Sequence, residues 1–250
     1  MNQKLSVLEK VGYSLGDLSA NLVFQTLMTY LAYFYTDVYG LRPEVATPVI
    51  FSVGMVAAFA FNPLIGALAD RTNTRWGKFR PWILFTAIPL SAAALMAFTT
   101  PDFDEKGKVI YAVITYSLLL FLYAANNLPY AALSGVITGD MSERNSLSSY
   151  RFVAVMVAQF SVQSLMYPMI EYFGNGDKAA GFSKVMVWLA VIGALLMLIT
   201  FFTTRERIIP APGQKSSLAQ DLKALPRNRP WLIMLVSTVL VFITLAMKGG

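Results

Sequence analysis

Residues 44–69 of this chain read EVATPVIFSVGMVAAFAFNPLIGALA, and residues 70–82 continue with DRTNTRWGKFRPW. The first segment is apolar over more than the about 20 residues that a helix needs to cross the hydrocarbon core of a bilayer. The second segment is short and strongly basic. An apolar segment of this length that ends in a basic turn is typical of a membrane-spanning helix that ends at the cytoplasmic face.

The same alternation of apolar stretches and short polar runs continues along the whole chain. Of its 250 residues, 56% are hydrophobic and 14% are charged, whereas about a quarter are charged in an ordinary soluble domain. The expected spans are residues 12–37, 44–69, 81–99, 109–137, 150–172, 182–204 and 230–247. The composition therefore predicts an all-α, polytopic membrane protein in contact with the lipid bilayer.

The basic residues are distributed unevenly between the polar runs. Most of the 20 lysine and arginine residues lie in the N-terminal segment and in alternate connections, at residues 71–80, 144–151 and 205–229. By the positive-inside rule these runs are cytoplasmic. The N-terminus is therefore expected in the cytoplasm, in a multi-pass protein of the cell (inner) membrane. The net charge of +6 then reflects topology, and no nucleic-acid partner is expected.

The chain contains no cysteine and no histidine. These residues are the ligands of most zinc sites, and histidine is the side chain that most often serves as a general base at neutral pH. The apolar stretches also lack paired carboxylates. We therefore expect no enzyme, no metal site and no cofactor.

Polar side chains recur at helical spacing inside three of the expected spans. In the first span they fall at i, i+3, i+7 and i+11, which places them on one helix face over about 16 Å. These residues are Ser14, Asp17, Asn21 and Gln25 in the first span, Tyr116, Tyr123, Asn127, Tyr130 and Ser134 in the fourth, and Arg151, Gln159, Gln163 and Tyr167 in the fifth. Such faces indicate a shared polar interior, as in one half of a transporter bundle. The periodicity alone also fits a channel or a receptor.

Each of these residues also has a purely structural interpretation. An asparagine or glutamine inside a span can simply hydrogen-bond a neighbouring helix. Asp17 and Arg151 are more costly to bury, so either they pair with each other or they line a water-filled pathway, which we favour. In the second span, small residues at four-residue spacing predict a seam against which another helix packs. They are Gly54, Ala58, Asn62 and Gly66.

The longest polar segment separates the sixth apolar stretch from the seventh. It contains Pro210, Pro212 and Gly213, followed by a short amphipathic piece at residues 216–225. We therefore expect three parts: a six-helix bundle at residues 1–204, a cytoplasmic linker with a short surface helix at 205–229, and a seventh transmembrane helix at 230–250.

Several motifs resemble those of known transporters. Residues 66–71, GALADR, are similar to a loop signature of the major facilitator superfamily. Residues 70–82 more narrowly resemble the glycoside-pentoside-hexuronide cation symporters, the family of melibiose permease. Further segments agree with this family in order along the chain: residues 12–17, 34–41, 127–133, 148–152 and 228–231. The resemblance implies the six-helix N-terminal half of a major facilitator fold plus one helix of the second half.

The resemblance also implies secondary active transport of a sugar or glycoside, by alternating access and with a cation gradient as the energy source. Asn21 and Asn127 stand where the melibiose carrier has sugar-binding aspartates, and Arg151 matches an arginine of its sugar site. Amides remain able to hydrogen-bond sugar hydroxyls. Asp17, Gln25 and Tyr123 complete the candidate substrate-binding set. The residues implied to form a conformational gate are Asp70, Arg71, Arg75, Lys78 and Arg80.

The chain departs from the family at the expected cation site. The melibiose carrier places two carboxylates and an intervening asparagine in its second helix, where this chain has Ala58, Asn62 and Phe61. Because hard cations take oxygen ligands and favour carboxylates, a complete Na⁺ site is not expected. Asp17 and Asn62 remain as candidates for coupling to H⁺ or Na⁺. Ala131 also replaces a family tryptophan near the sugar.

The length of the chain leaves a second hypothesis open. The family fold needs two six-helix halves, and 250 residues supply one half, a linker and one further helix. The alternatives to a symporter are a uniporter, a half-transporter that functions only after self-association, and a truncated remnant that transports nothing.

Overall fold

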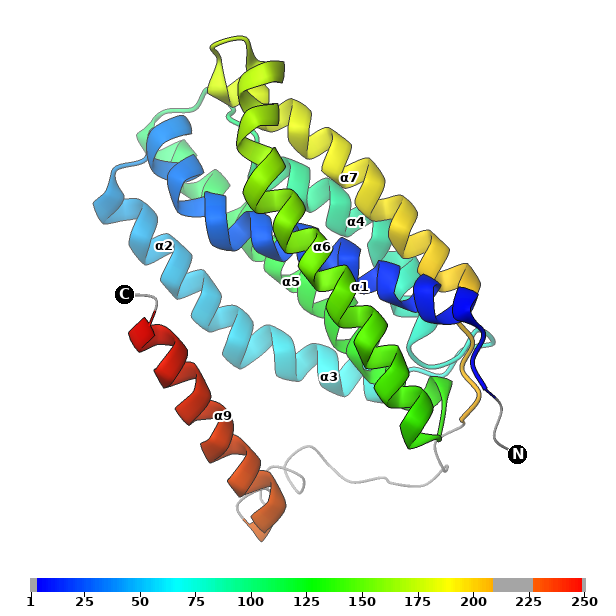
Figure 1. Cartoon of the computed structure of the whole chain (residues 1–250). Coiled ribbons are helices and arrows are strands. Elements are labelled where there is room, and N and C mark those ends of the chain that lie inside the picture. Colours follow the sequence, from blue (N-terminus) through cyan, green and yellow to red (C-terminus); the bar gives the residue numbers. More distant parts are fainter. Residues whose placement is uncertain (1–3, 209–226, 249–250) are drawn as a thin grey trace. The chain divides into compact units, whose positions relative to one another are not determined.

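The computed structural model describes residues 4–208 and 227–248, and the regular elements in these ranges are helices. The chain divides into two compact units, Met1–Ile209 and Pro210–Gly250. The helices of the first unit (Figure 1) are α1 (Val7–Tyr33), the π-helix η1 (Phe34–Val38), α2 (Pro43–Val56), the π-helix η2 (Ala57–Phe61), α3 (Asn62–Arg71), α4 (Arg80–Ala97), α5 (Glu105–Ile137), α6 (Met141–Gly174) and α7 (Lys178–Thr203).

These helices coincide with the apolar stretches expected from the sequence. In the described ranges, five are long and apolar enough to cross a membrane: Pro43–Arg71, Arg80–Ala97, Glu105–Ile137, Met141–Gly174 and Lys178–Thr203. The helix α1 is equally long but carries Glu9, Lys10 and Asp17, which lower its apolar character. The predicted multi-pass membrane fold, a six-helix half followed by a further helix, is confirmed.

Aspartates and prolines set where the helices begin and where their backbone pattern changes. Asp104, Asp140 and Asp177 stand at the N-caps of α5, α6 and α7 and accept hydrogen bonds from first-turn N–H groups, which have no partner inside a helix. Pro81 occupies the first turn of α4, where its missing N–H is not needed. The π-helical turn η2 comes just before Pro63, which cannot donate to the preceding turn.

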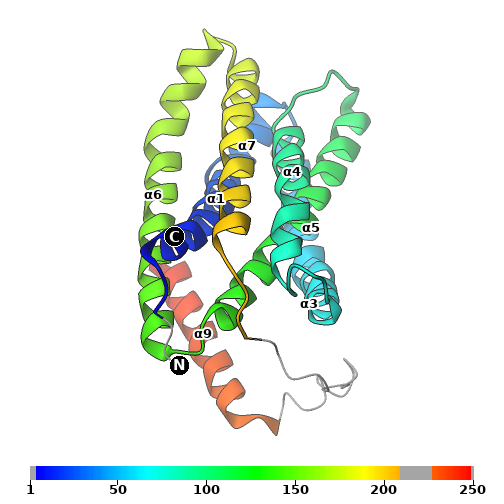
Figure 2. The same ribbon diagram turned by 90° about the vertical axis from the view of Figure 1, so that its right-hand side faces the viewer.

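The helix α1 lies at the centre of the packing in the first unit. It packs along α6 and α7, while α4 packs along α5 and α7. Figure 2 shows α6, α7 and α4 side by side. Phe34, Phe98 and Phe182 are at most 1% exposed, and the rings of Phe98 and Phe182 lie 5.0 and 5.2 Å from that of Phe34. These rings form an aromatic core beyond the C-terminal end of α1.

Small residues let α1 and α7 approach each other closely. Thr200 donates its hydroxyl to the carbonyl of Gly12 at 2.8 Å, and Ser19 donates to the carbonyl of Gly193 at 2.9 Å. A side chain at Gly12 would collide with Thr203. The close packing of this helix pair therefore depends on the absence of a side chain at Gly12.

The seam expected on the second span is not a packing surface in the part of the chain that the structure describes. A Cβ added at Gly54 or Gly66 would meet no atom within 4 Å, and Asn62 is exposed. This prediction was wrong within the first unit. The segment instead packs on α5 through Ile65, which clusters with Ala124 and Ala125.

The segment after α7 stays with the bundle. The N–H groups of Arg207 and Ile208 donate to the carbonyl of Val136 at 2.8 and 3.0 Å. Residues 205–208, expected in the linker, thus pack with the first unit. The surface helix expected at residues 216–225 lies outside the described residues. In the second unit, α9 (Arg229–Lys248) is the helix expected at 230–247.

Candidate functional site

Asp17 of α1 and Arg151 of α6 form an ion pair within the first unit. Arg151 Nε donates to Asp17 Oδ2 at 2.7 Å, and the two side chains are 29% and 7% exposed. Asn21, one turn further along α1, donates from Nδ2 to Asp17 Oδ1 at 3.2 Å. Both carboxylate oxygens are therefore engaged, which offsets part of the cost of removing these charges from water. Three residues predicted for the site lie together here.

Two tyrosines support the guanidinium of Arg151. Tyr13 and Tyr130 are fully buried, and their rings stack with centroids 4.6 Å apart and an interplanar angle of 11°. Each hydroxyl donates to the backbone carbonyl of the other residue, at 3.0 and 2.7 Å. The guanidinium carbon lies 5.7 and 5.5 Å from the two ring centroids, within the range of cation–π attraction. The tyrosine pair thus joins α1 to α5 and positions Arg151.

Tyr13 was not among the residues predicted for the site. It precedes Asp17 by four residues in α1, and this spacing places the two side chains on the same helix face. That spacing is the signal that would have found it. Nothing in the sequence indicates its partner, because Tyr130 lies 117 positions away.

Other polar groups on α1, α5 and α6 are candidates for contact with a ligand. Within residues 4–208 and 227–248, the terminal nitrogens of Arg151 and the side-chain amide of Gln25 make no hydrogen bond. Asn127 Nδ2 donates to the hydroxyl of Tyr123 at 3.4 Å. The ring of Tyr123 stacks on that of Phe24, with centroids 6.1 Å apart. Guanidinium and amide donors of this kind can bind uncharged hydroxyl groups.

Two asparagines lie apart from the ion pair. Asn62 begins α3 and is exposed, and no contact joins it to Asp17 within the described ranges. Asn126 is fully buried and donates from Nδ2 to Thr86 Oγ1 at 2.7 Å. Asn126 therefore links α5 to α4, the structural role that an amide inside a span can have.

The basic loop at residues 70–80 is held by contacts of several kinds. Lys78 Nζ lies 3.0 Å from Asp70 Oδ1. Arg75 is exposed, with its guanidinium carbon 4.7 Å from the Trp76 ring centroid. Arg80 Nη2 donates to the carbonyl of residue 201 at 2.7 Å. Arg71 is exposed at the end of α3.

Glu206 binds the backbone of residues 78–80, the turn that leads into α4. Its carboxylate accepts hydrogen bonds from the N–H groups of residues 78, 79 and 80 at 2.8, 2.7 and 2.9 Å. Gly77 makes room for it, with a φ of +113° and no side chain where the carboxylate lies. Sequence reasoning missed Glu206, which is 126 positions from Arg80.

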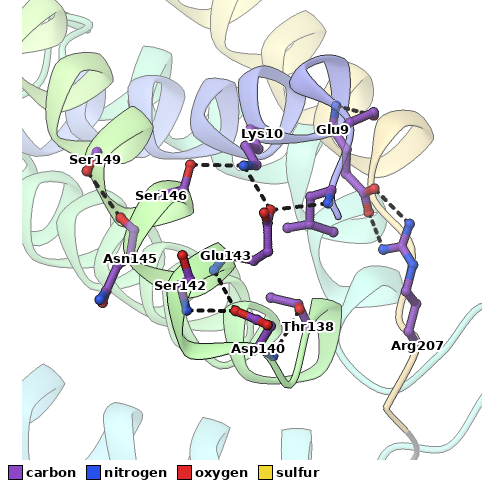
Figure 3. Close-up of polar contacts among 12 residues, drawn as sticks. Glu9, Lys10, Thr138, Asp140, Ser142, Glu143, Asn145, Ser146, Ser149 and Arg207 are labelled. Carbon is purple, nitrogen blue, oxygen red and sulfur yellow. Dashed lines mark hydrogen bonds and ion pairs between the residues drawn. The ribbon is translucent and has the colours of Figure 1, made fainter. Parts of the chain in front are cut away.

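Ion pairs also tie the start of α1 to α6 and to the segment after α7 (Figure 3). Lys10 Nζ lies 2.8 Å from Glu143, which also accepts the N–H of Leu5 at 3.1 Å. Glu9, with a side chain 7% exposed, accepts two hydrogen bonds from Arg207 at 2.6 and 2.8 Å. These hydrogen bonds raise the pKa of the Arg207 guanidinium. Residues 205–208 thereby hold α1, α4 and α5 at one end of the bundle.

Comparison with known families covers almost the whole chain. The family described as MFS/sugar transport protein matches residues 12–250. The chain belongs to this family. The predicted resemblance to glycoside-pentoside-hexuronide cation symporters is confirmed.

Named relatives are similar to this chain along their matched lengths. The inner membrane symporter YicJ of Escherichia coli (strain K12) is 39% identical over 100% of this chain and 54% of its own length. The isoprimeverose transporter of Lactiplantibacillus pentosus is 35% identical over 91% of this chain and 48% of its own length. The glucuronide carrier protein homolog of Escherichia coli (strain K12) is 34% identical over 98% of this chain and 53% of its own length. The chain spans about half the length of these relatives.

Proposed function

We propose that this chain forms the N-terminal half, with one further helix, of a secondary active transporter. The transporter carries a sugar or glycoside across the cell membrane by alternating access, together with H⁺ or Na⁺. The names of the relatives support transport, and an inner membrane symporter is among them. We propose the same inner-membrane location for this chain, with a cytoplasmic N-terminus.

The observation that carries this proposal is the cluster around Arg151. A guanidinium with free terminal nitrogens is held on a tyrosine pair beside Asp17 and Asn21. Charged side chains inside a membrane protein face the bundle interior or a water-filled path and mark substrate or ion pathways. Fixed N–H donors beside the half-buried amide of Asn21 suit a ligand rich in hydroxyl groups.

The coupling ion is proposed to act through Asp17. It is the sole carboxylate on residues 11–33 of α1, and the second span supplies only Asn62 at the family's cation site. The loop at residues 70–80 is proposed to form the gate at the cytoplasmic side of the transport path. In support, the N–H groups of residues 79 and 80 donate hydrogen bonds to Glu206, which lies in the segment after α7.

A binding experiment tests the substrate site. The chain in lipid nanodiscs is titrated with a panel of methyl glycosides and disaccharides, and the variants Arg151→Ala and Asn127→Ala are compared with the wild type. Loss of a hydrogen bond from a charged group should weaken binding by about tenfold or more. Arg42→Ala is the matched control, because Arg42 pairs with Glu105 on the exposed surface. The assignment fails if no sugar binds, or if neither site variant changes the affinity.

A second experiment tests the coupling. Proteoliposomes that contain the chain and an internal pH dye receive an inward sugar gradient, with and without Na⁺. Symport predicts acidification of the lumen or Na⁺-dependent uptake. Sugar uptake with neither response would make the protein a uniporter.

A further inference from the structure

We infer that the site selects uncharged glycosides, and that Asp17 is the residue that discriminates against substrates carrying a carboxylate. The inference rests on the proposed function and names the substrate class of the same site. Family membership leaves this question open, because isoprimeverose and glucuronide carriers both occur among the relatives.

The charge inventory of the bundle is the first step. The helical segments that form the bulk of the first unit contain one carboxylate, Asp17, and one cation, Arg151. These segments are residues 11–33 of α1, 45–69 of α2 and α3, 81–97 of α4, 109–137 of α5, 145–170 of α6 and 185–203 of α7. The other charged side chains of the described helices lie near the helix ends. The formal charge of the site within the described residues is therefore zero.

The geometry of the pair is the second step. Arg151 Nε already donates to Asp17 Oδ2 at 2.7 Å, so the positive charge has an internal counter-ion. A substrate carboxylate would lose its hydration on entry and would meet a nearby negative charge. An uncharged hydroxyl avoids both effects and can accept hydrogen bonds from the free terminal nitrogens of Arg151.

The supports of the pair make displacement of Asp17 unfavourable. Asn21 holds the second carboxylate oxygen, at 3.2 Å. Tyr13 and Tyr130 hold the guanidinium from one side. If a substrate carboxylate took the place of Asp17, this side chain, 7% exposed, would be left as an unpaired buried charge, which is strongly destabilising. In its ionised state Asp17 therefore acts as the counter-ion of Arg151, and the selection against carboxylates applies to this state.

The test compares glycosides with uronates of the same ring. The chain in nanodiscs is titrated with methyl α- and β-glucopyranosides and galactopyranosides and with the corresponding methyl glycopyranosiduronates. The wild type should bind at least one neutral glycoside about tenfold or more tightly than its uronate. Equal or tighter binding of the uronates overturns the inference and leaves the proposed function standing. If neither class binds, the proposed function fails and the inference fails with it.

Substitution of Asp17 tests the inference through a gain in uronate binding. Asp17→Asn keeps an oxygen that can accept from Arg151 Nε but leaves the site with a net positive charge. It should lower the preference for neutral glycosides by about tenfold or more, because uronates gain a charge-assisted hydrogen bond. Asp102→Asn is the matched control, since Asp102 is an exposed carboxylate outside the helices. An unchanged preference in a folded Asp17→Asn protein overturns the inference.

A variant that adds a negative charge, instead of removing one, tests the inference if Asp17→Asn does not fold. Asn21→Asp adds a second negative charge beside the pair, so uronate binding should fall by about a further tenfold while neutral glycosides change less. If uronate and neutral affinities fall equally, charge is not the basis of the selection and the inference is overturned.

Discussion

Replacing Glu206 by alanine is expected to destabilise the first unit, because the N–H groups of residues 78–80, which lie just before and at the first residue of α4, would lose their shared acceptor. These hydrogen bonds measure 2.8, 2.7 and 2.9 Å. An N-cap acceptor contributes about 0.5–2 kcal/mol, and a negative charge at a helix N-terminus adds about 0.3–1 kcal/mol. We expect a loss of about 2 kcal/mol, which corresponds to a decrease in Tm of roughly 4–8 °C.

The assay is thermal unfolding followed by tryptophan fluorescence, which suits this site because Trp76 and Trp82 flank the capped turn. Glu206→Gln keeps an acceptor without the charge, so its Tm should lie between those of the wild type and Glu206→Ala. Glu44→Ala is the control, since Glu44 is exposed in the first turn of α2. If the Glu206→Ala and Glu44→Ala proteins unfold at the same temperature, the capping argument is refuted.

A double-mutant cycle with Gly77 separates the cap from general destabilisation. A side chain at Gly77 would occupy the place of the Glu206 carboxylate, and the φ of +113° adds backbone strain. Gly77→Ala should therefore cost about 3 kcal/mol, of which about 2 kcal/mol is loss of the cap and about 1 kcal/mol is strain. In the Glu206→Ala background only the strain remains, about 1 kcal/mol. Additive effects of the two substitutions would contradict the structure.

Three further substitutions test other contacts by the same measurement. Arg207→Ala leaves the nearly buried Glu9 without its partner and should lower the free energy of unfolding by about 2 kcal/mol. Arg42→Ala breaks an exposed pair and should lower it by less than about 1 kcal/mol. Equal losses would show that the Glu9 pair contributes no more than an exposed one. Tyr13→Phe keeps the ring stack but removes one hydrogen bond, so about 1 kcal/mol should be lost, and a loss near zero would mean that the hydroxyl is replaced by water. Gly12→Ala forces a collision with Thr203 and should lower the free energy of unfolding by about 1–3 kcal/mol. Gly54→Ala meets open space and should be neutral or stabilising. A larger loss for Gly54→Ala than for Gly12→Ala would place the packing seam on α2.

The positions of the helices could be predicted because they depend on local properties. A span needs a minimum apolar length whatever its neighbours are. The stretches at 81–99 and 182–204 accordingly appear as α4 (Arg80–Ala97) and α7 (Lys178–Thr203). The polar face of α1 followed from its spacing. The spacing correctly placed Asp17 and Asn21 on one face of α1, and in the structure Asp17 pairs with Arg151.

The prediction of a packing seam failed because it inferred a contact between helices from the residue spacing within one helix. The small residues of the second span looked like a packing seam, but the structure packs this segment on α5 through Ile65, and Gly54 and Gly66 face open space. The close helix approach occurs instead at Gly12, against α7. A small residue permits a neighbour to come close, but it does not create one.

Composition, apolar length and motif are properties of contiguous residues, so they were enough to predict the class of fold, the family and the residue types of the candidate site. The packing of the helices was needed to show which of these residues lie together. Asp17 meets Arg151 across 134 positions, Tyr13 meets Tyr130 across 117, and Glu9 meets Arg207 across 198. Such pairs follow from the way the helices pack against each other, and the periodicity of one helix carries no information about the register of the next.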